Sequence, residues 1–285
     1  MNLRARLFIA LQHILPQHFL SRMMWRLTRC EYKWLLKLTL PLFIRIFKVN
    51  MEEAKNSDWK SYSSFNNFFT RELNDEAREI SSDEKSIASP VDGAVSQLGK
   101  INNDLIFQAK GHAYSLTQLL GDREDLSKTF INGQFNTIYL SPKDYHRIHM
   151  PVDGTLKEMI HVPGELYSVN PTTVENVPAL FARNERVICM FDTPVGPMAM
   201  ILVGAIFVSS IETVWHGEVT PPTRKDIRNW KYDEEKISYA KGQEMGRFNM
   251  GSTVILLYAN KKMNWEKELQ ADQKVQLGEV IGQLK

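Results

Sequence analysis

Two histidines stand three positions apart in this chain of 285 residues, as His146 and His149. On a helical turn, side chains with this spacing share one face. Such a pair could supply two ligands to a metal ion, which needs at least a third. It could also act as acid and base, because imidazole titrates near neutral pH, or consist of two surface side chains held by ordinary hydrogen bonds. The spacing alone leaves these three uses open.

A serine preceded by a glycine lies near the end of the segment Lys241-Gly-Gln-Glu-Met-Gly-Arg-Phe-Asn-Met-Gly-Ser-Thr253. The hydroxyl of Ser252 could be a nucleophile, or only a turn hydroxyl before the apolar run that follows. The pattern is not the G-x-S-x-G of a hydrolase nucleophile elbow. No G-K-[ST] follows it, as one would in a P-loop. Taken by itself, the segment predicts no particular reaction.

Charge is distributed unevenly along the chain. Residues 1–50 hold nine Lys/Arg and one acidic residue, Glu31, a net charge of +8, whereas the remainder carries −6. The overall charge of +2 argues against a protein that binds nucleic acid over its whole surface. The two cysteines, Cys30 and Cys189, form no C-x-x-C pair. A disulfide scaffold is therefore excluded, and a reducing compartment is the default expectation.

The basic head also carries apolar residues at helical spacing. They form two series, Leu3, Leu7, Leu11, Ile14 and Leu15, and then Trp34, Leu35, Leu38, Leu42 and Ile46. No apolar run reaches the length of a membrane span, about 18 residues, and basic residues interrupt every apolar block, unlike in a signal peptide. Such helices can lie in the bilayer interface or cap the body with their basic face in water. Periodicity leaves both possibilities open.

The pattern changes after the head. Residues 51–85 are predicted to be mostly helical, and from residue 86 strands are predicted near 137–140, 187–191, 198–210 and 253–258. The tetrapeptide Pro90-Val-Asp-Gly93 recurs as Pro151-Val-Asp-Gly154, which suggests a duplicated β motif. We therefore expect an α+β protein, with an amphipathic helical region at 1–60 and a mostly β body at 61–285, resembling a sandwich or barrel.

Several motifs, in their order along the chain, give a more specific indication than any one of them. The chain resembles the bacterial phosphatidylserine decarboxylases, which are pyruvoyl-dependent, self-processing lyases. The matching segments are Phe68-Phe-Thr-Arg-Glu-Leu73, Ser89-Pro-Val-Asp-Gly93, Lys110-Gly-His-Ala-Tyr-Ser-Leu116, Leu140-Ser-Pro-Lys-Asp-Tyr-His-Arg-Ile-His-Met-Pro151, Pro163-Gly-Glu-Leu-Tyr-Ser-Val-Asn170, Asn184-Glu-Arg186, Val203-Gly-Ala205 and the Gly-Ser-Thr block. The chain departs from the family at Met250, where the family has Leu, and at Glu79, where it has Pro.

The resemblance implies specific roles for five residues. The proenzyme would cleave itself between Gly251 and Ser252, giving a β chain of residues 1–251 and an α chain of residues 252–285. Ser252 would attack and then become the pyruvoyl group, which forms a Schiff base with the substrate amine. By the family pattern, His149 is the base, Asp92 orients it, and His146 is the proton donor in decarboxylation. Asp153, in the second tetrapeptide, is expected to be a turn carboxylate.

The resemblance also implies partners and a location. The substrate would be phosphatidylserine, the products phosphatidylethanolamine and CO₂, and the cofactor a pyruvoyl group without metal. We expect peripheral attachment at the cytoplasmic face of the cell membrane, no nucleic-acid partner, and an α/β unit that could form a homodimer. The alternatives are a pyruvoyl decarboxylase of another amine, a serine hydrolase using Ser252, His149 and Asp92 without self-cleavage, and a lipid-binding module without activity.

Overall fold

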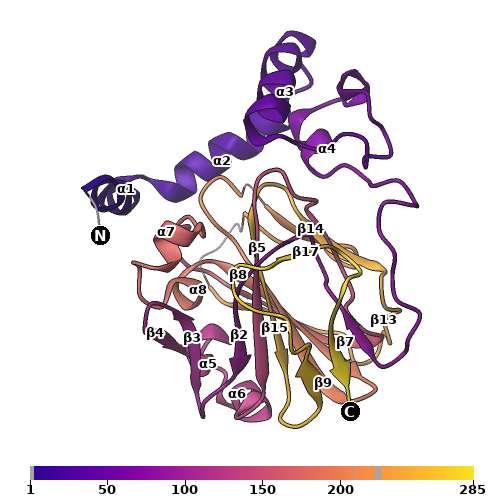
Figure 1. The fold of residues 1–285 in the computed structure, drawn as a ribbon. Coiled ribbons are helices and arrows are strands. Elements are labelled where there is room, and N and C mark those ends of the chain that lie inside the picture. Colours follow the sequence, from indigo (N-terminus) through magenta and orange to yellow (C-terminus); the bar gives the residue numbers. More distant parts are fainter. Residues whose placement is uncertain (1–2, 209, 222–225) are drawn as a thin grey trace.

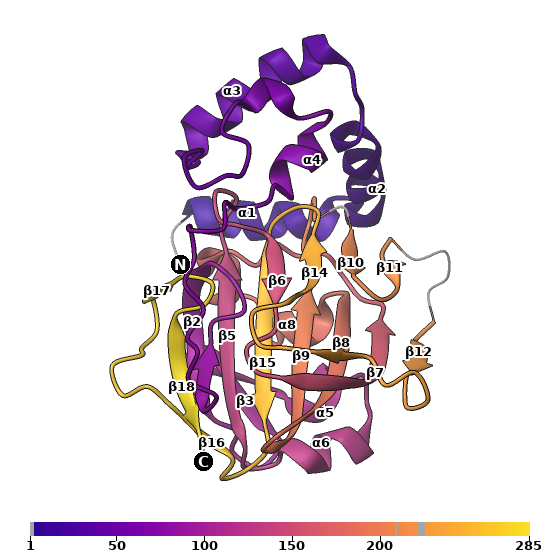
Figure 2. The same cartoon turned by 90° about the vertical axis from the view of Figure 1, so that its right-hand side faces the viewer.

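A computed structural model describes residues 3–208, 210–221 and 226–285. Three helices, α1 (Leu3–Ile14), α2 (Gln17–Thr28) and α3 (Lys33–Phe47), form a cap at one end of a β body, and the C-terminus lies at the opposite end (Figures 1 and 2). Within the described residues, no helix combines the length and the apolar character that a bilayer crossing requires. The two predicted helical series of the head are thus confirmed as helices.

The segment after the cap is mostly irregular, and the prediction of helix over 51–85 was wrong. It contains only the short 3₁₀ helix η1 (Trp59–Ser61) and α4 (Phe65–Phe69). Asn50 accepts a hydrogen bond from the amide of Glu52, and Asp58 accepts one from Lys60. Asn, Asp and Ser side chains offer the backbone such local bonds in place of a helix.

The body is built on a nine-stranded antiparallel sheet. Its strand order is β12-β7-β8-β9-β15-β5-β2-β17, with β13 also paired to β7, and it forms an open path rather than a closed barrel over the described residues. The strands are β2 (Gly93–Lys100), β5 (Gln134–Leu140), β7 (Gly154–Val162), β8 (Arg186–Thr193), β9 (Gly196–Val203), β12 (Arg228–Lys231), β13 (Ser238–Tyr239), β15 (Ser252–Tyr258) and β17 (Lys274–Val275). The expected α+β class with a mostly β body is confirmed.

Three smaller sheets and four short helices surround the large sheet. The sheets have the orders β1-β18-β16, β11-β10-β14-β6 and β3-β4. Their strands are β1 (Ser86–Ala88), β3 (Leu105–Ala109), β4 (His112–Ser115), β6 (Arg147–His149), β10 (Ile211–Thr213), β11 (Gly217–Glu218), β14 (Glu244–Phe248), β16 (Met263–Trp265) and β18 (Val280–Leu284). The helices are α5 (Leu116–Leu119), α6 (Glu124–Phe130), α7 (Pro171–Val174) and α8 (Leu180–Arg183).

The centre of the large sheet is the core of the molecule. Every residue of β15 is buried, as are the last six of β9. Such continuous burial is what a strand covered on both faces requires. The strand predicted over 198–210 ends earlier than expected, at Val203, where Gly204 and a turn follow. Residue 209 of that prediction lies outside the described residues.

The two copies of the repeated tetrapeptide occupy matching places. The turn at residues 90–93 leads into β2 and the turn at 151–154 into β7, and each of these strands lies next to an edge strand of the large sheet. Each turn also accepts a hydrogen bond from a residue just before the other turn. The amide of Ala88 donates to the carbonyl of Pro151, and the amide of His149 donates to the carbonyl of Pro90. This arrangement places Asp92 beside the segment that carries both histidines.

The cap is joined to the body through polar contacts and to the segment that follows it through a small apolar cluster. Gln12 and Gln17 accept hydrogen bonds from the backbone amides of Ser168 and Leu166. Leu36 and Leu40 of α3 pack with Tyr62 and with Phe68 of α4.

Candidate active site

Ser252 begins β15 in the middle of the large sheet. It pairs with Leu140 of β5, and its side chain is fully buried. Its Oγ has no hydrogen-bond partner among the described residues. Because a buried polar atom without a partner costs about 1–3 kcal/mol, such an atom calls for an explanation.

His146 lies beside Gly251, the residue before this serine, and is also fully buried. Its Nδ1 is 2.8 Å from the carbonyl oxygen of Asp144, and its ring lies against Phe69, with centroids 4.2 Å apart. Since a carbonyl only accepts, Nδ1 carries the proton and Nε2 is left with a free lone pair. Nε2 has no partner within the described part of the chain, and it lies 3.6 Å from the position a Cβ would take on Gly251. A second orphaned atom thus faces the bond before Ser252.

His149 has a different setting although it is only three residues away. Its Nδ1 is 2.7 Å from the carbonyl oxygen of Gly242, and its Nε2 is 3.1 Å from the hydroxyl of Tyr145. Both ring nitrogens are therefore engaged. Burial lowers the pKa of both histidines, that of His146 to about 3, so both are neutral near pH 7.

Asp92 is held by an arginine that the sequence analysis did not identify as a site residue. Arg78 donates from Nε to Oδ1 at 3.0 Å and from Nη2 to Oδ2 at 2.5 Å, and it also pairs with Glu53 at 2.8 Å. The backbone amide of Leu277 donates to Oδ1 at 2.8 Å. Within the described residues, no hydrogen bond joins Asp92 to His149. The predicted relay residues share one region without forming one hydrogen-bonded chain.

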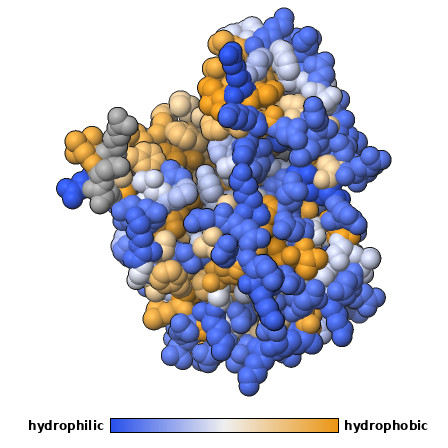
Figure 3. Space-filling view, viewed as in Figure 1, coloured by the Kyte–Doolittle hydropathy of each residue, from blue (hydrophilic) through white to orange (hydrophobic). Residues whose placement is uncertain are grey.

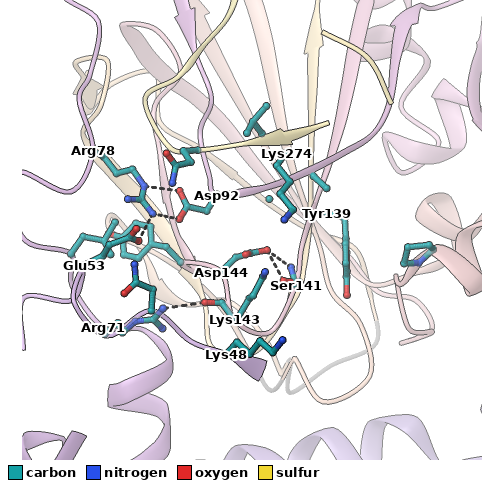
Figure 4. Close-up of a pocket in the computed structure, with 18 residues that line it drawn as sticks. Lys48, Glu53, Arg71, Arg78, Asp92, Tyr139, Ser141, Lys143, Asp144 and Lys274 are labelled. Carbon is teal, nitrogen blue, oxygen red and sulfur yellow. Dashed lines mark hydrogen bonds and ion pairs between the residues drawn. The ribbon is translucent and has the colours of Figure 1, made fainter. Parts of the chain in front are cut away.

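A cavity of about 430 Å³ opens beside Asp92 (Figure 4). Five basic and three acidic side chains line it, and two of the acids, Asp92 and Glu53, are already paired with Arg78. Lys48, Lys143 and Lys274 come from the end of α3, the loop before His146 and β17. Burial raises the pKa of the third acid, Asp144, which favours its neutral form. The excess of positive charge suits an anionic group.

A separate apolar groove of about 350 Å³ lies along the cap and includes Met250. Residues of α2 and α3 form most of its wall, together with Phe65 and Met250. Met250 directly precedes Gly251, so the groove ends at the segment before Ser252. An alkyl chain lying among the cap helices could therefore reach the site.

Exposed apolar side chains gather on the cap beside hydrophilic ones (Figure 3). Fourteen of the nineteen exposed large apolar side chains in the described residues lie before residue 48. They include Ile14, Trp34, Leu38 and Leu42, which are 81%, 67%, 64% and 54% exposed. Contiguous exposed apolar surface of this kind marks a site of protein or membrane contact.

The remaining predicted groups have simpler settings. Asp153 is exposed and accepts a hydrogen bond from the amide of Lys241 at 2.7 Å, as a turn carboxylate would. No group of three His, Cys, Asp or Glu side chains in the described residues could hold a metal ion. His146 and His149 thus lack the third ligand that a zinc site would need.

Comparison with known proteins gives matches along nearly the whole chain. The family model described as phosphatidylserine decarboxylase matches residues 65–283, and a model described as PSD matches residues 7–48. A protein of Nitrosococcus oceani is 55% identical over 284 residues, covering 99% of this chain and 93% of the relative. Proteins of Hahella chejuensis and Idiomarina loihiensis are 52% and 51% identical, covering 100% and 97% of this chain and 96% of each relative. All three are named phosphatidylserine decarboxylase proenzyme.

Proposed function

The chain belongs to the phosphatidylserine decarboxylase family, and on that premise we propose that it is a carboxy-lyase that converts phosphatidylserine to phosphatidylethanolamine and CO₂. The observation that carries the proposal is the pair of buried, unpartnered atoms, Ser252 Oγ and His146 Nε2, at the family's Gly-Ser-Thr block. Their positions suit a serine that is converted into a pyruvoyl group by self-cleavage.

Self-cleavage begins when Ser252 Oγ attacks the carbonyl carbon of Gly251. The peptide C–N bond breaks and an ester replaces it. Elimination across the serine then releases Gly251 as a carboxylate and leaves a dehydroalanine. One water is taken up and one ammonia leaves, giving a pyruvoyl group at the new amino terminus. A base must remove the hydroxyl proton first, since a serine hydroxyl is a weak nucleophile.

Two histidines are candidates for that base. The family pattern assigns His149, with Asp92 to orient it and His146 as the later proton donor. A second candidate is His146 itself, because its Nε2 lone pair is free and lies beside Gly251. The carbonyl of Asp144 accepts from Nδ1–H and so leaves Nε2 unprotonated beside Gly251, which is the protonation state that a general base needs.

Alanine variants distinguish the two candidates. By the family pattern, His149→Ala stays uncleaved and His146→Ala cleaves but decarboxylates poorly. If His146 is the base, His146→Ala stays uncleaved and His149→Ala is only slowed. His216→Ala is the matched control, since His216 is exposed and lies against Trp230 away from the site. Normal cleavage by both site variants would contradict both assignments.

The pyruvoyl group would supply an electron sink for the electron pair that remains on the substrate carbon when CO₂ leaves, the role pyridoxal phosphate has elsewhere. The basic cavity beside Asp92 would receive the anionic headgroup, and the apolar groove ending at Met250 an acyl chain. His146 is buried and neutral at rest, and it could take up a proton at Nε2 and return it to the substrate carbon.

The two products of cleavage would remain one folded unit. In the uncleaved chain, β15 of the α chain lies between β5 and β9 of the β chain, β17 pairs with β2, and β18 pairs with β1. These ladders need no covalent link at Gly251. A homodimer of this unit stays a prediction.

We propose peripheral attachment at the cytoplasmic face of the cell membrane through the cap. The exposed apolar side chains of α1 to α3 and the net charge of +8 over residues 1–50 are the features of an interfacial anchor. Anionic lipid attracts such a segment by about 1 kcal/mol for each basic residue near the surface.

The function is tested with vesicles that contain phosphatidylserine. We expect the full chain to release CO₂ and form phosphatidylethanolamine in equal amounts, and to leave free serine untouched. Turnover of free serine without lipid turnover would favour decarboxylation of another amine. Ester hydrolysis by an uncleaved chain, blocked by a serine-directed acylating reagent, would favour the hydrolase alternative. Chelation is expected to leave the activity unchanged.

A further inference from the structure

Only three residues connect the end of β14 at Phe248 to the start of β15 at Ser252. Asn249 is the only one of them with a polar side chain, since Met250 and Gly251 follow it. It is 2% exposed. The geometry of the bond before Ser252 therefore depends on how this short segment is held at Asn249.

The side chain of Asn249 is fixed on both sides. Its Oδ1 accepts from Nδ2 of Asn66 in α4 at 2.7 Å, and its Nδ2 donates to Oγ of Ser210 at 2.5 Å. Its backbone amide donates to the carbonyl of Ser210 at 3.0 Å. The same helix α4 supplies Phe69, whose ring lies against His146. One element thus contacts both the cleavage segment and the histidine beside it.

Ser210 extends this contact to the cap. Its Oγ donates to Oε1 of Glu218 at 2.7 Å and accepts from Nη2 of Arg29 at 3.1 Å. Glu218 Oε1 is also bonded to Arg29 and to Nε1 of Trp25, the latter at 2.9 Å. Trp25 lies in α2 and Arg29 is its C-terminal cap, with the guanidinium 4.6 Å from the indole centroid.

A hydrogen-bonded chain therefore runs from the end of α2 to the residue two positions before Gly251. An apolar contact runs beside it, because Met24, Leu27 and Thr28 of α2 share the groove with Met250. The outer side of α2 carries Phe19 and Met23, which are 66% and 47% exposed. The helix that would meet the bilayer is thus the one that holds the cleavage segment.

We propose that Asn249 is a positioning residue for the bond between Gly251 and Ser252, and that the seating of α2 on the body, through Arg29, Glu218 and Ser210, sets its position. The proposal rests on the proposed self-cleavage. It gives the cap a second role beside lipid contact. Self-cleavage is fast only when α2 is docked.

The test measures the rate of self-cleavage of the full chain, with Arg29→Met and Asn249→Ala as the main variants. A displacement of about 1 Å can cost on the order of a hundredfold in rate, and we expect each variant to cleave about tenfold more slowly. Arg26→Met is the matched control: it removes the same charge from the same helix, and Arg26 is exposed with no side-chain hydrogen bond among the described residues. It should cleave at the unmodified rate.

Two further variants separate positioning from general destabilisation. Arg29→Lys keeps a cation opposite Glu218, and it should recover most of the rate at an unchanged melting temperature. The double variant with Arg29→Met and Asn249→Ala should be no slower than Asn249→Ala alone, because both act through one chain of contacts.

Failure of this proposal and failure of the proposed self-cleavage would give different results. A normal rate for Arg29→Met would overturn the link to α2, and a normal rate for Asn249→Ala would overturn its positioning role. If Arg26→Met slowed self-cleavage as much as Arg29→Met, the loss of a positive charge alone would explain the effect, and the link to α2 would also be overturned. A chain that never cleaves, even unmodified, would instead contradict self-processing.

Discussion

The cap and the body place their apolar side chains on opposite sides. In the body, the central strands β9 and β15 are buried, and only five of the nineteen exposed large apolar side chains lie there. In α2 the buried residues are Gln17, Ser21 and Thr28, all polar, whereas Phe19 and Met23 face outward. Helix α2 therefore reverses the usual pattern, in which a helix packs its apolar face against a core. Helix α3 keeps that pattern in part, because Leu36 and Leu40 are buried with Tyr62 and Phe68.

This difference shows which solvent each region is built for. The body buries apolar surface at about 25 cal/mol per Å², as a protein in water does. The cap contacts the body partly by hydrogen bonds such as those of Gln12 and Gln17, and many of its apolar side chains are exposed. These exposed side chains support the proposed contact with lipid. The active site lies where these two regions meet.

The largest effect is expected when the proposed nucleophile in the body, the hydroxyl of Ser252, is removed. Ser252→Ala should remain a single chain without detectable decarboxylation of phosphatidylserine, because no oxygen is left to attack Gly251. Gel electrophoresis of the denatured protein and the lipid assay measure both. The control is Thr253→Val, which removes the next buried, unpartnered hydroxyl in the same strand. Cleavage of the Ser252→Ala chain, or loss of cleavage by Thr253→Val, would show that Ser252 is not the essential hydroxyl.

The next largest effect is expected when exposed apolar side chains of the cap are replaced by charged ones. Leu38→Glu with Leu42→Glu should reduce binding to phosphatidylserine vesicles more than tenfold, since each buried leucine contributes about 1.5–3 kcal/mol. Co-sedimentation measures the binding. Leu105→Glu on β3 is the matched control, because Leu105 is 52% exposed but lies on the body. Equal loss from the control would mean that the cap has no special part in binding.

The smallest effect concerns pH. Burial lowers the pKa of His146 to about 3 and lowers that of His149 as well, so the neutral, basic form persists below pH 6.5. If His146 is the base, the self-cleavage rate should change by less than about twofold between pH 8 and pH 6 and fall only at lower pH. An imidazole with the ordinary pKa of about 6.5 would lose roughly fourfold over the same range. A fourfold loss would show that the base is solvated.

The sequence predicted those parts of the site that local motifs carry. The segment with His146 and His149, the turn with Asp92 and the Gly-Ser-Thr block were all identified, and each lies in or next to a strand of the predicted β body. The helical head was identified because its periodicity is strong.

The parts that sequence reasoning missed depend on contacts between distant segments. Arg78 pairs with Asp92 from an irregular stretch that was predicted to be helical, and no local motif marks this arginine as a partner of Asp92. Asn249, Ser210 and Glu218 meet through the fold and share no spacing. The helix predicted over 51–85 failed because Asn50 and Asp58 bond locally to the backbone.

The measurement that tests the central claim most directly is the mass spectrum of the purified, denatured chain. We predict two polypeptides, residues 1–251 and residues 252–285, the second lighter by one ammonia than its sequence requires. That mass defect would identify the converted Ser252. A single intact chain of 285 residues, from protein shown to be folded, would contradict self-processing and the cofactor derived from it.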